Sequence, residues 1–102
     1  MIRNDIIATL RAHESELKAS GVASLSVIGS AARGGQRGDS DIDVVVRLSE
    51  DSRIEGFGYF GRLATIGRRL EAILGTQVDV VAEPIQKERL RERIQKERLL
   101  AF

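Results

Sequence analysis

The chain has 102 residues, of which 42% are hydrophobic and 30% charged, and its formal net charge is +1. These values are typical of one globular domain, so we expect residues 1–102 to form a single domain with no membrane attachment and no direct nucleic-acid binding. The absence of cysteine excludes disulfides and thiolate metal sites. An acid in the N-terminal stretch "MIRNDIIATL" is atypical of a signal peptide, so we expect a cytoplasmic protein.

Residues 4–20 are predicted to form an amphipathic helix. Asn4 is a suitable N-cap, and Gly21 is a natural C-terminal stop. The apolar residues at helical spacing are Ile6, Ile7, Leu10 and Leu17. The β-branched stretch "VASLSVIGS" then predicts a strand that ends near Gly29.

The middle of the chain contains the clearest strand. Residues 31–40 are typical of a short helical turn followed by a glycine-rich loop, and residues 49–54 of a second loop. Between them, residues 41–48 ("DIDVVVRL") predict a strand. Side chains alternate along a strand, so Ile42, Val44 and Val46 should share one face, and Asp41, Asp43 and Val45 the other.

The second half of the chain predicts a helix, a strand and a final helix. Residues 54–74 have helical apolar spacing, weakened by four glycines. Residues 76–82 ("TQVDVVA") predict a third strand, which Pro84 ends. Residues 85–100 are typical of a charged helix, and the apolar end "LLAF" should pack on the domain or at an interface. The predicted fold is α/β (α+β), with a mixed three- to four-stranded sheet and helices mainly on one face.

Three acids interrupt apolar strands. Asp41 and Asp43 are two residues apart on one strand, so their side chains point the same way, and Asp79 lies in the middle of another strand. Aspartate is disfavoured in strands, and turn chemistry explains only the Asp39-Ser40-Asp41 end of the motif. Magnesium takes one or two carboxylates together with substrate phosphates and water. The acids therefore predict a magnesium site formed by Asp41, Asp43 and, if its strand is adjacent, Asp79.

The segment before these acids has features of an anion site. Gly29 permits a tight turn and a close backbone approach, and Ser30 offers a hydroxyl and an amide at the start of a helical turn. Arg33, or the more distant Arg37, can neutralise further charge. A phosphate-binding turn beside magnesium ligands indicates transfer from a nucleoside triphosphate, with Asp79 orienting or deprotonating the attacking hydroxyl.

These residues resemble the minimal nucleotidyltransferase family of the polymerase-β-like superfamily. The resemblance rests on Gly29-Ser30, Ala32-Arg33-Gly34 and Ser40-Asp41-Ile42-Asp43, with "QVDVV" at 77–81 similar to the third-acid strand. It implies that Asp41 and Asp43 bind Mg²⁺, that Asp79 is the third acid, and that Gly29, Ser30, Arg33 and Ser40 bind the nucleotide, ATP. The chain departs from the family at Ala31, where arginine is frequent, and at Gly38, where proline is common.

Members of this size resemble the antitoxin of a two-gene system. The resemblance implies a homo- or hetero-oligomer with a HEPN ribonuclease toxin, and transfer of AMP from ATP to a toxin tyrosine. Two alternatives stay open: an antitoxin that acts by binding alone, and nucleotidyl transfer to a small molecule or RNA.

Several conspicuous residues have simpler explanations. His13 is expected to be a polar residue on a helix face rather than a catalytic base. Phe57 and Phe60 have the spacing of core residues, and Tyr59 lies off that stripe. The charges of the last helix are typical of a solvated face rather than an RNA site.

Overall fold

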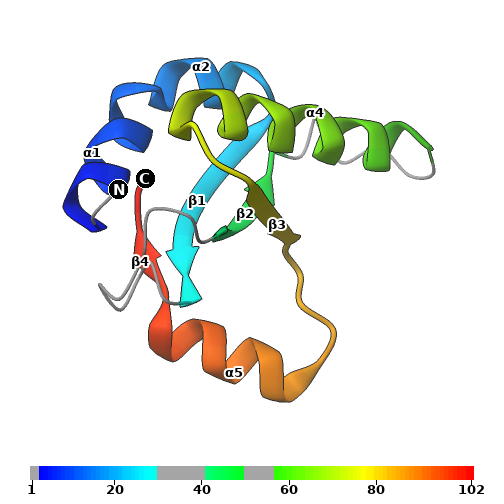
Figure 1. Cartoon of the computed structure of the whole chain (residues 1–102). Coiled ribbons are helices and arrows are strands. Elements are labelled where there is room, and N and C mark those ends of the chain that lie inside the picture. The colour runs from blue at the N-terminus through cyan, green and yellow to red at the C-terminus, as the bar shows by residue number, and fades with distance from the viewer. Residues whose placement is uncertain (1–2, 30–40, 50–56) are drawn as a thin grey trace.

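The structure of the chain is a computed structural model that describes residues 3–29, 41–49 and 57–102. Ser30, Arg33 and Ser40 of the predicted site, and the predicted turn and loops over 31–40 and 50–54, lie outside these ranges. The elements are, in chain order, α1 (Arg3–Ala12), α2 (Glu14–Ala19), β1 (Val22–Ile28), β2 (Ile42–Leu48), α4 (Phe57–Leu74), β3 (Val78–Ala82), α5 (Glu88–Glu97) and β4 (Leu99–Leu100) (Figure 1).

The strands form one mixed sheet in the order β3-β2-β1-β4. β1 pairs antiparallel with both β2 and β4, whereas β2 and β3 are parallel. Parallel neighbours need a crossover connection, and α4 lies in the connection between β2 and β3. The predicted α/β class and four-stranded mixed sheet are therefore confirmed.

The main core lies between the sheet and the helices α1, α2 and α4. Ile42, Val44 and Val46 are fully buried there, as their alternation along β2 predicts. The helices contribute Ile6, Ile7, Leu10, Leu17, Ile66, Leu70 and Leu74 to this core. Among the described helices, α5 departs from this arrangement. It packs on the opposite face of the sheet, where Ile94 forms a small second core with Ile28 and Val45.

The predicted helix over 4–20 is two helices. The chain turns at His13, whose backbone N–H donates to the carbonyl of Leu10, three residues back, at 3.1 Å. This tighter turn separates α1 from α2, and both Leu10 and Leu17 remain fully buried. The interruption lets each helix place its own apolar side on the core.

The core stripe of α4 includes Tyr59 instead of Phe60. Tyr59 and Leu63 pack against the main core and continue the stripe of Ile66 and Leu70, whereas Phe60 is 68% exposed. The core role predicted for Phe60 is therefore wrong. None of the helices within the described ranges has the length and apolar character to cross a membrane.

The C-terminal helix ends earlier than predicted, and the last residues complete the sheet. α5 stops at Glu97, and Leu99 and Leu100 pair with Val27 and Ser26 of β1. The backbone N–H of Ala101 donates to the Leu25 carbonyl at 2.8 Å. Packing of the "LLAF" end on the domain is thus confirmed, in the form of an edge strand.

Candidate active site

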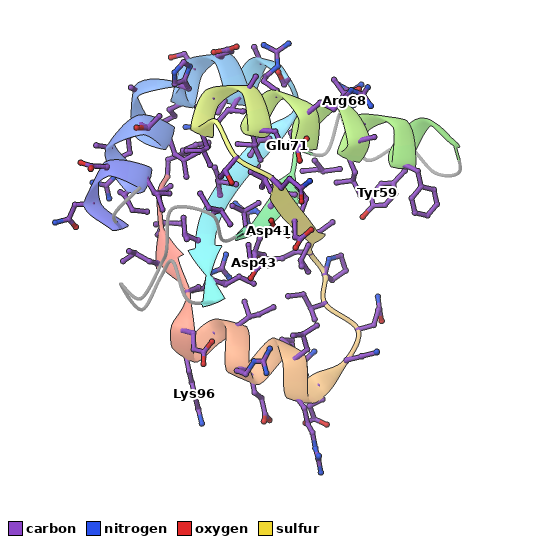
Figure 2. The ribbon with its side chains drawn as sticks, in the orientation of Figure 1. Asp41, Asp43, Tyr59, Arg68, Glu71 and Lys96 are labelled. Carbon is purple, nitrogen blue, oxygen red and sulfur yellow. The ribbon has the colours of Figure 1, made fainter. Side chains whose placement is uncertain are left out.

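Three acidic residues gather on the face of the sheet opposite the main core. Asp43 and Asp79 occupy paired positions on the adjacent parallel strands β2 and β3. Asp41 immediately precedes β2 and, two residues before Asp43, belongs to the same side of the strand. Figure 2 shows Asp41 and Asp43 in this part of the sheet. The structure therefore provides the strand adjacency that the sequence left as a condition.

The electrostatics of Asp43 show how closely the acids interact. Burial raises the pKa of Asp43, and the negative charge of Asp79, a hydrogen bond with Asp79 and the charge of Asp41 raise it further. A carboxylate with a raised pKa and acidic neighbours gains most from a nearby cation, because the cation offsets both the repulsion and the lost hydration.

The donor set suits a hard divalent cation but is not a closed metal cage. Within residues 3–29, 41–49 and 57–102, no group of three or more histidine, cysteine, aspartate or glutamate side chains is arranged to hold a metal ion. Magnesium does not require such a cage, since it usually takes only one or two carboxylates and completes its shell with water and phosphate oxygens. Oxygen donors from Asp41 and Asp43 fit that requirement.

Gly29 lies beside the Asp43 carboxylate. It follows β1 with a φ of +71°, and the residue before it, Ile28, pairs with Asp43. A Cβ at position 29 would lie 2.8 Å from Oδ2 of Asp43, inside any ordinary contact distance. The structure therefore favours glycine at position 29 for both its conformation and its missing side chain, whereas the predicted approach of Gly29 to a phosphate stays a prediction.

A polar link that sequence reasoning missed holds α5 against the acid-bearing face. The guanidinium of Arg98 donates to the hydroxyl of the fully buried Ser26 at 3.1 and 3.0 Å, and to Oε1 of Glu83 at 2.9 Å. Together with Ile94, this link keeps α5 over the part of the sheet next to Asp43. Ser26, a polar residue in the largely apolar strand β1, could have indicated that a polar partner was needed. The sequence does not identify that partner, because Arg98 lies 72 residues away.

His13 lies in the turn before α2, outside the acid group. Its ring nitrogen Nδ1 and Oε2 of Glu16 are 2.8 Å apart. His13 is thus a polar residue away from the acids, as expected, but it lies in the turn between α1 and α2 rather than on a helix face.

Comparisons with known proteins agree on one family. The family model described as "nucleotidyltransferase domain" matches residues 10–101. Protein adenylyltransferase MntA of Thermococcus cleftensis is 36% identical over 78 residues, which cover 76% of this chain and 73% of that protein.

Two solved structures have a similar fold. One, described as a candidate minimal nucleotidyltransferase, has a TM-score of 0.77 and 33% identity, with 97% of this chain and 95% of that chain covered. The other is a complex of a tri-AMPylated HEPN toxin of Shewanella oneidensis with an MNT antitoxin. It has a TM-score of 0.61 and 13% identity, and covers 94% of this chain and 71% of that chain. At 13% identity the second likeness concerns the fold alone.

Proposed function

Because this chain belongs to the nucleotidyltransferase domain family, we propose that it is a protein adenylyltransferase that transfers AMP from ATP to a tyrosine of a HEPN ribonuclease toxin, and thereby acts as its antitoxin. The observation that carries the proposal is the convergence of Asp41, Asp43 and Asp79 beside the turn at Gly29. Such a grouping has the oxygen donors and the close backbone approach that a metal-bound triphosphate needs.

In this proposal, each acid has a separate task. Asp41 and Asp43 hold Mg²⁺, which neutralises charge on the transferring phosphoryl group when it is bound. Asp79 orients the acceptor hydroxyl and takes its proton as the oxygen bonds to the α-phosphorus and pyrophosphate leaves. The paired positions of Asp43 and Asp79 put the acceptor and the metal side of the reaction next to each other.

The remaining roles concern the triphosphate. Gly29 and Ser30 supply backbone and hydroxyl donors, Arg33 supplies positive charge, and Ser40 precedes the first acid. The absence of a side chain at Gly29 leaves the Asp43 carboxylate free to face the nucleotide, because a Cβ there would collide with it.

Support for a protein acceptor comes from relatives. The relative from Thermococcus cleftensis is named a protein adenylyltransferase, and the Shewanella oneidensis complex contains an AMPylated HEPN toxin. Silencing by binding alone, and transfer to a small molecule or RNA, are the competing functions.

The test incubates the purified chain with α-³²P-labelled ATP, Mg²⁺ and a purified HEPN toxin as the candidate acceptor. We expect label on the HEPN protein and a tyrosine-linked AMP by mass spectrometry. The double variant Asp41→Asn with Asp43→Asn should abolish labelling, whereas Asp5→Asn, an equal change on the exposed side of α1, should not. Labelling that persists in the double variant contradicts the catalytic assignment. Loss of toxin activity without label supports binding alone, and label on RNA supports the third function.

A further inference from the structure

A groove runs between α4 and the α2 region on the helical side of the molecule. It consists of two adjoining hollows of about 380 and 570 Å³ that share Thr65 in their lining. We name it the α2–α4 groove. Its α4 side is lined by Gly58, Gly61, Thr65, Arg68 and Ala72, and its other side by His13, Glu16 and Ser20. The sheet separates this groove from Asp43.

The shape of the groove matches a third helix. The lining residues of α4 are spaced by three and four residues, so they form one side of the helix, and those from 13 to 20 follow the same spacing. From Gly58 to Ala72 the side extends about 21 Å at 1.5 Å per residue, which corresponds to about four helical turns. No side chain stands at Gly58 or Gly61, which permits close approach of another helix.

The charge of the groove is positive. Arg62, Arg68 and Arg69 line it, and Glu16 is the one carboxylate among its described lining residues. With neutral histidine the formal sum is three minus one, or +2. Glu16 is already engaged, because its oxygens lie 2.8 Å from His13 Nδ1 and 2.5 Å from Arg69 Nη1. These hydrogen bonds, from His13 first and then Arg69, lower the pKa of Glu16, so it is ionised at neutral pH.

Among the described residues, the contacts given for the other two arginines are long. Arg68 Nη2 lies 3.5 Å from the Thr65 hydroxyl, and Arg62 Nη1 lies 3.3 Å from the Ser20 carbonyl. Neither of these contacts is to a carboxylate. Both guanidinium groups can therefore bind carboxylates of a partner without first breaking an ion pair that the structure shows.

One aromatic ring is exposed on another side of the same half of α4. Phe60 precedes Gly61 and is 68% exposed, and its ring contacts Tyr59 edge-to-face with centroids 5.5 Å apart. Figure 1 shows this half of α4 extending beyond the sheet, and Figure 2 shows Tyr59 on it. Phe60 lines neither hollow, so this ring lies outside the α2–α4 groove.

We propose that the α2–α4 groove is a docking site for an acidic amphipathic helix of a partner protein. Carboxylates of that helix pair with Arg62 and Arg68, and its apolar side packs over Gly58, Gly61 and Ala72. Among the described helices of a second copy of this chain, none is both acidic and long enough to fill the groove. The exposed helix α5 carries four basic residues (Arg89, Arg91, Arg93 and Lys96) and three acidic ones (Glu88, Glu92 and Glu97), and the more acidic α2 has only six residues. Docking here leaves the acids on the other face of the sheet open.

The test uses a fluorescein-labelled synthetic helix of about 15 residues, with leucines on one side and glutamates on both flanks. Fluorescence anisotropy measures its affinity for the full chain. We expect saturable binding of the glutamate peptide. The same peptide with lysine in place of glutamate should bind at least about tenfold more weakly.

Two groove variants and two matched controls locate the site. Gly61→Leu fills the groove, and it should fold because a Cβ at 61 meets no atom within 4 Å. Arg68→Glu reverses one charge of the groove. Each should weaken binding about tenfold or more. Gly67→Ala adds a methyl on the sheet side of α4, 3.6 Å from Val80, and Arg93→Glu makes the same charge reversal on α5, so both should bind as the native chain does.

Four results overturn the proposal: no binding of the acidic peptide, equal binding of the lysine peptide, unchanged affinity of both groove variants, or equal weakening by the controls. Melting temperatures establish whether each variant is folded. If Gly61→Leu does not fold, Arg68→Glu still tests the groove. A labelled single-stranded RNA is titrated in parallel, and RNA binding that exceeds peptide binding and is lost in Arg68→Glu assigns the groove to nucleic acid instead.

Discussion

Replacing Gly29 with alanine should reduce both the stability and the proposed transfer activity, for two separable reasons. The first is the backbone, because Gly29 has a φ of +71°. The second is the neighbour, because the added Cβ would lie 2.8 Å from Oδ2 of Asp43. Only the second reason involves the candidate site.

The size of each effect follows from the structure. A non-glycine residue in the left-handed region costs roughly 1–2 kcal/mol. Since each kcal/mol shifts the melting temperature of a domain of this size by about 4–8 °C, the backbone term alone predicts a fall of about 4–16 °C. To reach an ordinary contact of 3.4 Å, the Asp43 carboxylate and the new methyl must separate by a further 0.6 Å, from 3.4 minus 2.8. Displacement of that order at a reacting centre predicts a loss of about tenfold to a hundredfold in AMP transfer.

Gly75→Ala is the matched control. Gly75 ends α4 with a φ of +72°, and a Cβ there would meet no atom within 4 Å. Thermal melting in EDTA should therefore show a backbone cost for Gly75→Ala similar to that for Gly29→Ala. The labelled-ATP assay should show a large loss for Gly29→Ala and none for Gly75→Ala.

A double-mutant cycle isolates the contact with Asp43. In an Asp43→Ala background the collision is gone, so Gly29→Ala should cost no more stability than Gly75→Ala does. The reasoning is refuted if Gly29→Ala retains the activity of Gly75→Ala, or if its stability cost is the same with and without the Asp43 carboxylate.

Three further predictions concern other parts of the fold. The pKa of Asp43 is raised in the folded protein, so the folded state loses stability as pH rises from the ordinary value of 3.8 through the raised one. Asp43→Asn should thus raise the melting temperature of the metal-free protein at neutral pH, by an amount that shrinks as pH approaches 3.8; a gain independent of pH contradicts this. Arg98→Ala should lower the free energy of unfolding, measured with urea, by about 1–3 kcal/mol, because the buried Ser26 hydroxyl loses the guanidinium N–H donors. Adding Ser26→Ala to Arg98→Ala should restore part of the lost stability, because no unpaired hydroxyl is then buried. Deletion of residues 99–102 should lower the melting temperature and increase light scattering, because β1 loses its edge partner; an unchanged melting curve contradicts it.

Local sequence patterns were sufficient to predict β1, β2 and β3, and alternation predicted the faces of β2 and β3. Along β2 the fully buried Ile42, Val44 and Val46 alternate with Asp43, as a period of two requires. The same rule separated Val78 from Asp79 on β3. These features are predictable because they depend on residues one or two positions apart in sequence.

Other local predictions failed because tertiary packing decided them. Helical spacing alone placed Phe60 in the core, but the position of α4 on the sheet put Tyr59 there. A strand as short as β4 has too few residues to show a period, and it exists because β1 offers it an unpaired edge. The link between Arg98 and Ser26 joins residues 72 positions apart, which no periodicity connects.

The sequence by itself identified the candidate site residues: two acids two residues apart, a third acid in a later strand, and a glycine before them. Only the tertiary structure decided that these residues lie close together. The parallel register of β2 and β3 pairs Asp43 with Asp79, and the end of β1 places Gly29 against the Asp43 carboxylate. The physical reason is that side-chain direction is a property of the local backbone, whereas strand order and register follow from burying the whole core at once.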